Sequence, residues 1–181
     1  MDGINGMTGC YSLVILSGLQ YVNINQIHFI NSDLIWLPIL ACLVFLFFNF
    51  RKKAKCFAGD VGSITIALWI MMIMLDLILH TKNWSYILFL SVYGVESILT
   101  ICHRLLLKQN IFEAHRLHVY QLLVNERKMP HLSVSISYAL IQTGAIGLVI
   151  FNRHFSFIIL SCIAILPLVT IYLFIKHRLL R

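Results

Sequence analysis

Six stretches of mostly apolar residues, separated by short polar segments, divide the chain. They cover approximately residues 7–22, 34–50, 62–80, 84–107, 131–151 and 155–175. A helix needs about 20 mostly apolar residues to span a bilayer, with a range of roughly 17 to 25. The first stretch is the weakest of the six, because it is short and contains Ser12, Ser17 and Gly18. The pattern predicts an all-α, polytopic membrane protein with about six transmembrane helices in a single transmembrane domain, residues 1–181.

The composition supports this class. Hydrophobic residues make up 60% of the chain and charged residues only 12%, whereas a soluble domain is about half apolar and a quarter charged. The net charge of +7 would also suit a nucleic-acid binder, but its distribution argues against nucleic acid as a partner. If the six stretches cross a bilayer, all but two of the 14 Lys and Arg residues fall on one side. Such a bias marks the cytoplasmic side, so both termini are expected there.

Three polar segments on this basic side could carry chemistry. The first, residues 1–9, combines glycines with Asp2 and Asn5 beside a predicted helix start. Glycine permits close approach of the backbone to a ligand, and a helix start favours anions. An ordinary capped helix terminus explains this spacing equally well.

The second segment, residues 51–63, is a basic run followed by Asp60 between two glycines at a helix start. Mg²⁺ takes oxygen ligands, usually one or two carboxylates together with phosphates and waters. Asp60 is therefore a candidate metal ligand. The positive-inside rule is a sufficient explanation for the lysines of this run, including Lys55.

The third segment, residues 110–121, contains His115, Arg116, His118 and Tyr120. On a helix, His115 and His118 would share one face. Arginine forms forked hydrogen bonds with phosphate, so the cluster suits a pyrophosphate. A zinc site lacks a third nearby ligand here, and an amphipathic surface helix with incidental histidines is the alternative. Glu96, inside the fourth stretch, is a costly intramembrane acid and hence a further functional candidate.

Taken together, the three segments resemble the polyprenyl-phosphate N-acetylhexosamine-1-phosphate transferase family, also called glycosyltransferase family 4. The matching motifs are Asp-Gly-x-x-Gly at residues 2–6, Phe-x-Gly-Asp-x-Gly-Ser at 57–63 and Ala-His-Arg-x-His-x-Tyr-Gln at 114–121. Their order and their alternation with hydrophobic spans match as well. The resemblance implies that the chain corresponds to the carboxy-terminal part of a larger helical membrane enzyme and lacks the family's amino-terminal half. Asn5 departs from the family pattern, which commonly has a second aspartate there.

The resemblance also implies an activity and residue roles. The family transfers an N-acetylhexosamine-1-phosphate, here expected to be GlcNAc-1-phosphate, from a UDP-sugar to undecaprenyl or another polyprenyl phosphate and releases UMP. Asp60 would bind Mg²⁺ or Mn²⁺. The implied catalytic residues are Asp2, Asp60, His115 and His118, and the implied substrate-binding residues are Asn5, Arg116 and Lys55.

The resemblance sets the expected context too. We expect a multi-pass protein of the bacterial inner membrane, with its catalytic loops in the cytoplasm, that acts in lipopolysaccharide, O-antigen or cell-wall biogenesis and can form homo-oligomers. Two alternatives remain open at this point. The chain could be a truncated, inactive relative, or a non-enzymatic membrane protein such as a transporter fragment.

Overall fold

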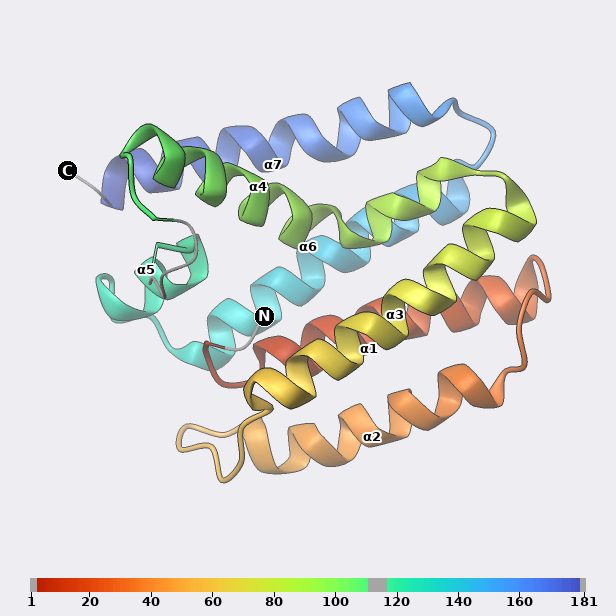
Figure 1. Cartoon of the computed structure of the whole chain (residues 1–181), viewed down its shortest axis with the longest axis horizontal. Coiled ribbons are helices and arrows are strands. Elements are labelled where there is room, and N and C mark those ends of the chain that lie inside the picture. Colours follow the sequence, from red (N-terminus) through yellow and green to blue (C-terminus); the bar gives the residue numbers. More distant parts are fainter. Residues whose placement is uncertain (1–2, 111–116, 180–181) are drawn as a thin grey trace.

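The computed structural model describes residues 3–110 and 117–179, and within these ranges it is helical and contains no strand. The elements are α1 (Met7–Asn25), α2 (Asp33–Asn49), α3 (Gly59–Thr81), the 3₁₀ helix η1 (Trp84–Leu90), α4 (Ser91–Leu106), α5 (Val119–Asn125), α6 (His131–Phe151) and α7 (Phe157–Leu179). The long helices lie side by side in one bundle (Figure 1). The predicted all-α, polytopic fold is confirmed.

All six predicted apolar stretches form helices. Among the described residues, four helical segments are long and apolar enough to cross a membrane: Gly59–Thr81, Trp84–Leu106, His131–Phe151 and Phe157–Arg178. The apolar helix α2 is shorter, with 17 residues. The helix α1 has 19 residues but is not among the four. Large apolar side chains such as Phe47, Val61 and Met72 point away from the protein, as expected for helices that face lipid.

Helix α1 runs through the middle of the bundle and packs against α2, α3 and α6. Most of its side chains are buried, including Tyr11, Ile15 and Leu19. Gly18 brings α1 close to α6, because a Cβ at this position would lie 2.8 Å from Ile146. Small residues at such contacts allow membrane helices to approach closely. Because α1 meets protein on several sides, its polar residues Ser12, Gln20 and Asn23 are buried within the bundle.

The fourth predicted span differs from the expected single helix, because it begins as η1 and continues as α4. The change from 3₁₀ to α geometry frees backbone groups inside the bundle. Gln142 of α6 binds two of them: its Nε2 donates to Leu88 O at 3.2 Å and its Oε1 accepts from Val92 N at 3.1 Å. Tyr11 donates to Gln142 Oε1 and accepts from Tyr93 N. Buried side chains therefore provide hydrogen-bond partners for the backbone groups at the η1–α4 junction, as irregular backbone within a membrane requires.

The connections between helices gather at two opposite ends of the bundle (Figure 1). Residues 26–32, 82–83 and 152–156 form one end. The other end holds residues 3–6, the 50–58 loop, α5 and the carboxy-terminal end of α7. The last turn of α4 with residues 107–110, and residues 126–130 after α5, belong to this end as well. We call it the basic end, because its segments hold ten of the twelve Lys and Arg residues that the structure describes. The predicted collection of the three motif segments on one side of the bundle is therefore observed for their described residues.

Candidate functional site at the basic end

The first motif segment lies between the other two. The side-chain Nδ2 of Asn5 donates to the backbone carbonyl of Arg51 at 2.9 Å, in the second segment. The backbone N–H of Asn5 donates to His131 Nδ1 at 3.2 Å, and its carbonyl accepts from Ser135 Oγ at 2.8 Å, both at the start of α6. Asn5, expected to bind substrate, thus uses its amide nitrogen to join two loops. Asp2 lies outside the described residues.

Asn49, the last residue of α2, makes a second connection between these loops. Its Oδ1 accepts from Gly6 N at 2.6 Å, and its Nδ2 donates to Cys56 O at 2.7 Å. The side chain is buried, so both bonds are shielded from water. Asn49 was not among the residues predicted from the sequence. The feature of the sequence that could have indicated Asn49 is its position as a polar residue at the end of the long apolar run of α2.

The glycines of the first motif are required by the structure. Gly6 has a φ of +84°, in the left-handed region that favours glycine, and a Cβ there would lie 2.6 Å from Phe50 Cδ2. At Gly3, a Cβ would lie 3.1 Å from Gln121 Nε2 and 3.2 Å from Tyr120 Cε2. The absence of side chains therefore allows the first segment to contact both the second and the third.

Asp60 lies in the first turn of α3 and is exposed. The preceding Gly59 turns the chain into the helix with a φ of +59°. At this position the backbone N–H groups and the helix dipole favour negative charge. Lys55 is also exposed, and its backbone N–H donates to Phe48 O at 2.9 Å. The 50–58 loop therefore folds back onto the end of α2, and its basic residues lie near the start of α3.

The surroundings of Asp60 determine which metal site it could form. Among residues 3–110 and 117–179, no three His, Cys, Asp or Glu side chains come together as a metal cage. Mg²⁺ does not need one, because it is commonly held by one or two carboxylates while substrate phosphates and waters complete its shell. One exposed carboxylate beside a basic loop fits a metal that arrives with a pyrophosphate. It does not fit a structural metal held by protein alone.

An apolar groove runs beside Asp60. It has a volume of about 670 Å³ and lies between α1, α2 and α3. Ala58 and Gly62, which flank Asp60 in sequence, line the groove together with Pro38, Ala41 and Trp69. Small side chains on its walls leave room for a long, thin apolar ligand. The groove thus places an apolar surface next to the candidate metal ligand.

In the third segment, His118 lies beside an acid from within the bundle. Its Nδ1 is 3.8 Å from Glu96 Oε1, and its ring stacks on Tyr120 at 5.3 Å between centroids. The same Glu96 oxygen accepts from Tyr120 N at 3.4 Å. Sequence reasoning selected Glu96 and His118 separately, but not as a pair.

The predicted helical spacing of the third segment is wrong at His118. This residue has extended backbone, with φ −66° and ψ 142°, and α5 begins only at Val119. An extended residue before the first helical turn is usual, and here it turns the His118 ring toward Glu96 and Tyr120. His115 and Arg116 lie outside the described residues.

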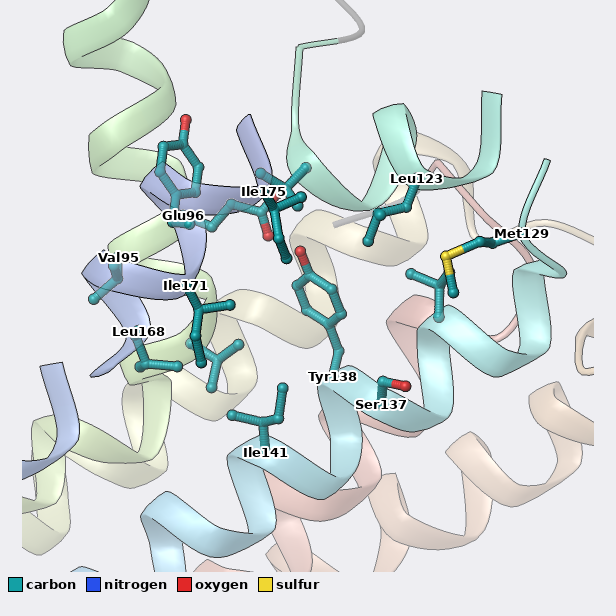
Figure 2. A pocket seen from close by; sticks show the side chains of 14 residues that line it. Val95, Glu96, Leu123, Met129, Ser137, Tyr138, Ile141, Leu168, Ile171 and Ile175 are labelled. Carbon is teal, nitrogen blue, oxygen red and sulfur yellow. The ribbon is translucent and has the colours of Figure 1, made fainter. Parts of the chain in front are cut away.

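Behind His118, Glu96 borders a small apolar cavity of about 150 Å³. Figure 2 shows the Tyr138 side chain, from α6, with its hydroxyl directed toward the Glu96 carboxylate, while Leu168, Ile171 and Ile175 of α7 form an apolar wall. The Tyr120 hydroxyl lies 3.3 Å from that of Tyr93. Glu96 thus lies among aromatic and apolar groups, and its contact with His118 connects α4 to the third motif segment.

Comparison with known proteins supports the resemblance drawn from the motifs. Residues 1–78 match the family described as glycosyl transferase family 4. The chain is 27% identical over 142 residues to a probable undecaprenyl-phosphate N-acetylglucosaminyl 1-phosphate transferase of Bacillus subtilis (strain 168). That match covers 76% of this chain and 39% of the relative, so the chain spans well under half of the relative's length. No solved structure matches the chain. With its apolar helices and the described parts of its motif segments at one end of the bundle, the chain is similar to glycosyl transferase family 4 over residues 1–78.

Proposed function

We propose that the chain acts in the transfer of N-acetylhexosamine-1-phosphate, specifically GlcNAc-1-phosphate, from a UDP-sugar to a polyprenyl phosphate such as undecaprenyl phosphate. The observation that carries the proposal is the meeting of the three motif segments beside an apolar groove. Asn5 and Asn49 join the first segment to the second, and Gly3 lies against Tyr120 and Gln121 of the third. The groove next to Asp60 offers an apolar surface for the hydrocarbon part of the acceptor.

In this reaction a phosphate oxygen of the acceptor attacks the sugar-linked phosphorus of the UDP-sugar. A new P–O bond forms, the pyrophosphate bond breaks, and UMP leaves with the bond electrons. Catalysis of such a transfer consists mostly of positioning and charge neutralisation. Mg²⁺ or Mn²⁺ bound through Asp60 would supply positive charge to the pyrophosphate oxygens. Lys55, His115, Arg116 and His118 would bind phosphate oxygens, and Asp2 and Asn5 would border the nucleotide-sugar pocket.

The same proposal includes the membrane orientation. Ten of the twelve described Lys and Arg residues belong to segments of the basic end, and a Lys/Arg bias in short loops marks the cytoplasmic side. The motif segments would then face the compartment that holds soluble nucleotide sugars. We propose the bacterial inner membrane and a role in cell-envelope polysaccharide synthesis.

The test is UMP release from UDP-GlcNAc and undecaprenyl phosphate by the full chain reconstituted in lipid nanodiscs with Mg²⁺. Asp60→Asn should abolish the release. Asp33→Asn is the matched control, because Asp33 is an exposed acid in the first turn of α2 at the opposite end of the bundle. Its rate should equal that of the unmodified chain. A chain that releases no UMP would contradict the proposal for this polypeptide, and full activity of Asp60→Asn would contradict the metal assignment.

A further inference from the structure

Lys176 is a buried cation near the carboxy-terminal end of α7, on the face that meets α4. Only 5% of its surface is exposed. Its Nζ donates to the Tyr172 hydroxyl at 2.5 Å, and this hydroxyl lies 3.0 Å from Thr100 Oγ1 of α4. An ammonium group has three donors, so this bond uses one of them. Tyr172 and Thr100 are themselves buried, which fixes the position of Lys176.

The charge of Lys176 is not balanced by a close acid. Within the described ranges, no carboxylate forms an ion pair with its ammonium group. Glu96 attracts the ammonium group electrostatically, but the close contacts of Glu96 include His118 and Tyr120 and, among the described residues, no ion pair with Lys176. A buried charge without a close partner costs free energy. The helix dipole favours a cation in the last turns of α7, but an exposed lysine, like the exposed Arg178, would meet that need equally well.

The space beside Lys176 is a groove between α4 and α7 with a volume of about 380 Å³. Its polar lining includes His103 and His177 in addition to Lys176, and its apolar wall includes Leu99, Leu106 and Leu173. The lining of the groove thus combines N–H donors with aliphatic surface. Such a combination near a membrane surface suits an amphiphile that has an anionic head and a hydrocarbon chain.

We propose that this groove binds an anionic phospholipid, with the phosphate on Lys176, His103 and His177 and an acyl chain against the leucines. Basic pockets between transmembrane helices on the cytoplasmic side are typical sites for anionic headgroups. The lipid phosphate supplies the missing counter-charge to Lys176. This site is separate from the Asp60 groove, which lies between α1, α2 and α3, and the inference does not depend on the proposed transferase activity.

Two free cysteines make the proposal testable without an activity assay. Cys102 is exposed and lines the groove, whereas Cys56 lies in the 50–58 loop at the same end of the bundle. The full chain is reconstituted in nanodiscs of phosphatidylcholine, with or without phosphatidylglycerol, and alkylated with N-ethylmaleimide. Mass spectrometry then gives the rate at each cysteine. Phosphatidylglycerol should slow the alkylation of Cys102 about fivefold, the effect expected for one basic residue with an anionic lipid, and leave Cys56 unchanged.

Variants separate this site from general surface charge. Lys176→Met should abolish the protection of Cys102, while Lys176→Arg should keep it. Lys53→Met removes a positive charge from an exposed position in the 50–58 loop. This variant should also retain the protection of Cys102. Equal Cys102 rates in the two lipid mixtures, or full protection in Lys176→Met, would overturn the proposal.

A second measurement does not rely on removing the buried lysine. Native mass spectrometry of the unmodified chain should show retained phosphatidylglycerol but no retained phosphatidylcholine. Leu173→Trp, at a position with 55% exposure on the groove wall, should fill the groove and abolish the retention. Displacement of phosphatidylglycerol by inorganic phosphate alone, or by equimolar undecaprenyl phosphate, would overturn the assignment to a phospholipid.

Discussion

The side-chain oxygen of Asn49 lies 2.6 Å from the backbone nitrogen of Gly6, which joins the end of α2 to the start of α1 across 43 residues of sequence. The side-chain nitrogen of the same residue donates to the backbone carbonyl of Cys56 at 2.7 Å. One buried side chain therefore sets the distance between the first motif segment and the loop that leads to Asp60.

Asn49→Ala should loosen both loops. It leaves Gly6 N–H and Cys56 C=O without this partner, and an unsatisfied buried group costs about 1–3 kcal/mol. We expect a lower unfolding midpoint in detergent and faster tryptic cleavage in the 51–55 run. Asn25→Ala is the control, because Asn25 also lies at a helix end but is exposed and bonds only within its own helix. Cleavage rates that match between the two variants would show that Asn49 does not fix the loop.

Two glycine substitutions should act in opposite directions. Gly6→Ala forces an alanine to a φ of +84° and places its Cβ 2.6 Å from Phe50, which should destabilise the protein by more than about 1 kcal/mol. Gly144→Ala lies inside α6 with no heavy atom within 4 Å of the new Cβ, so it should stabilise the protein by roughly 0.5–1 kcal/mol. Unfolding midpoints measure both.

If the double variant Gly6→Ala/Phe50→Leu recovers part of the stability lost in Gly6→Ala, the recovered part is the cost of the clash with Phe50 and the rest is the cost of the backbone strain. A Gly6→Ala variant as stable as the unmodified chain would contradict the role of this turn.

The helices could be predicted from the sequence because their signal is local. Length and apolarity suffice for stretches such as 62–80 and 131–151, and the structure extends them by only a few residues, to Gly59–Thr81, or not at all, at His131–Phe151. The meeting of the motif segments at one end also follows from the alternation of spans and loops. Neither inference requires knowledge of which side chains touch.

The features of the fold and the site that could not be predicted from the sequence depend on tertiary contacts. No local pattern shows that Gln142 will satisfy the backbone at Leu88 and Val92, since these residues approach only when α6 packs on the fourth span. For the same reason the fourth span could not be recognised as a 3₁₀ helix followed by an α-helix. The pairing of Glu96 with His118 requires the third segment to fold back onto α4.

Two buried glutamines should respond differently to the same substitution. Gln142→Leu removes contacts with Tyr11, Leu88 and Val92. Hydrogen bonds between membrane helices contribute about 0.6 kcal/mol on average and up to about 1.7, so a loss of roughly 1–3 kcal/mol is expected. In Gln20, neither side-chain polar atom has a partner within the described part of the chain. Gln20→Leu should therefore stabilise the protein, because an unsatisfied buried amide is replaced by an apolar group.

Unfolding midpoints in detergent again provide the measurement. A stabilised Gln142→Leu would mean that the backbone at the η1–α4 junction finds other partners. A destabilised Gln20→Leu would mean that the Gln20 amide is satisfied in the folded protein.

Glu96 should affect the proposed transfer through His118 rather than by touching substrate. Glu96→Gln keeps the size of the side chain and an oxygen that can accept from Tyr120 N–H, but it removes the negative charge 3.8 Å from His118 Nδ1. The fold should persist, while a misplaced His118 should lower kcat for UMP release by about ten- to a hundredfold. Glu96→Asp keeps the charge and should retain more activity than Glu96→Gln. Glu96→Leu removes the acceptor for Tyr120 as well and should lose both activity and stability. If Glu96→Gln keeps the full kcat while Glu96→Leu only unfolds earlier, the carboxylate serves the packing of α4 against α5 and does not position His118.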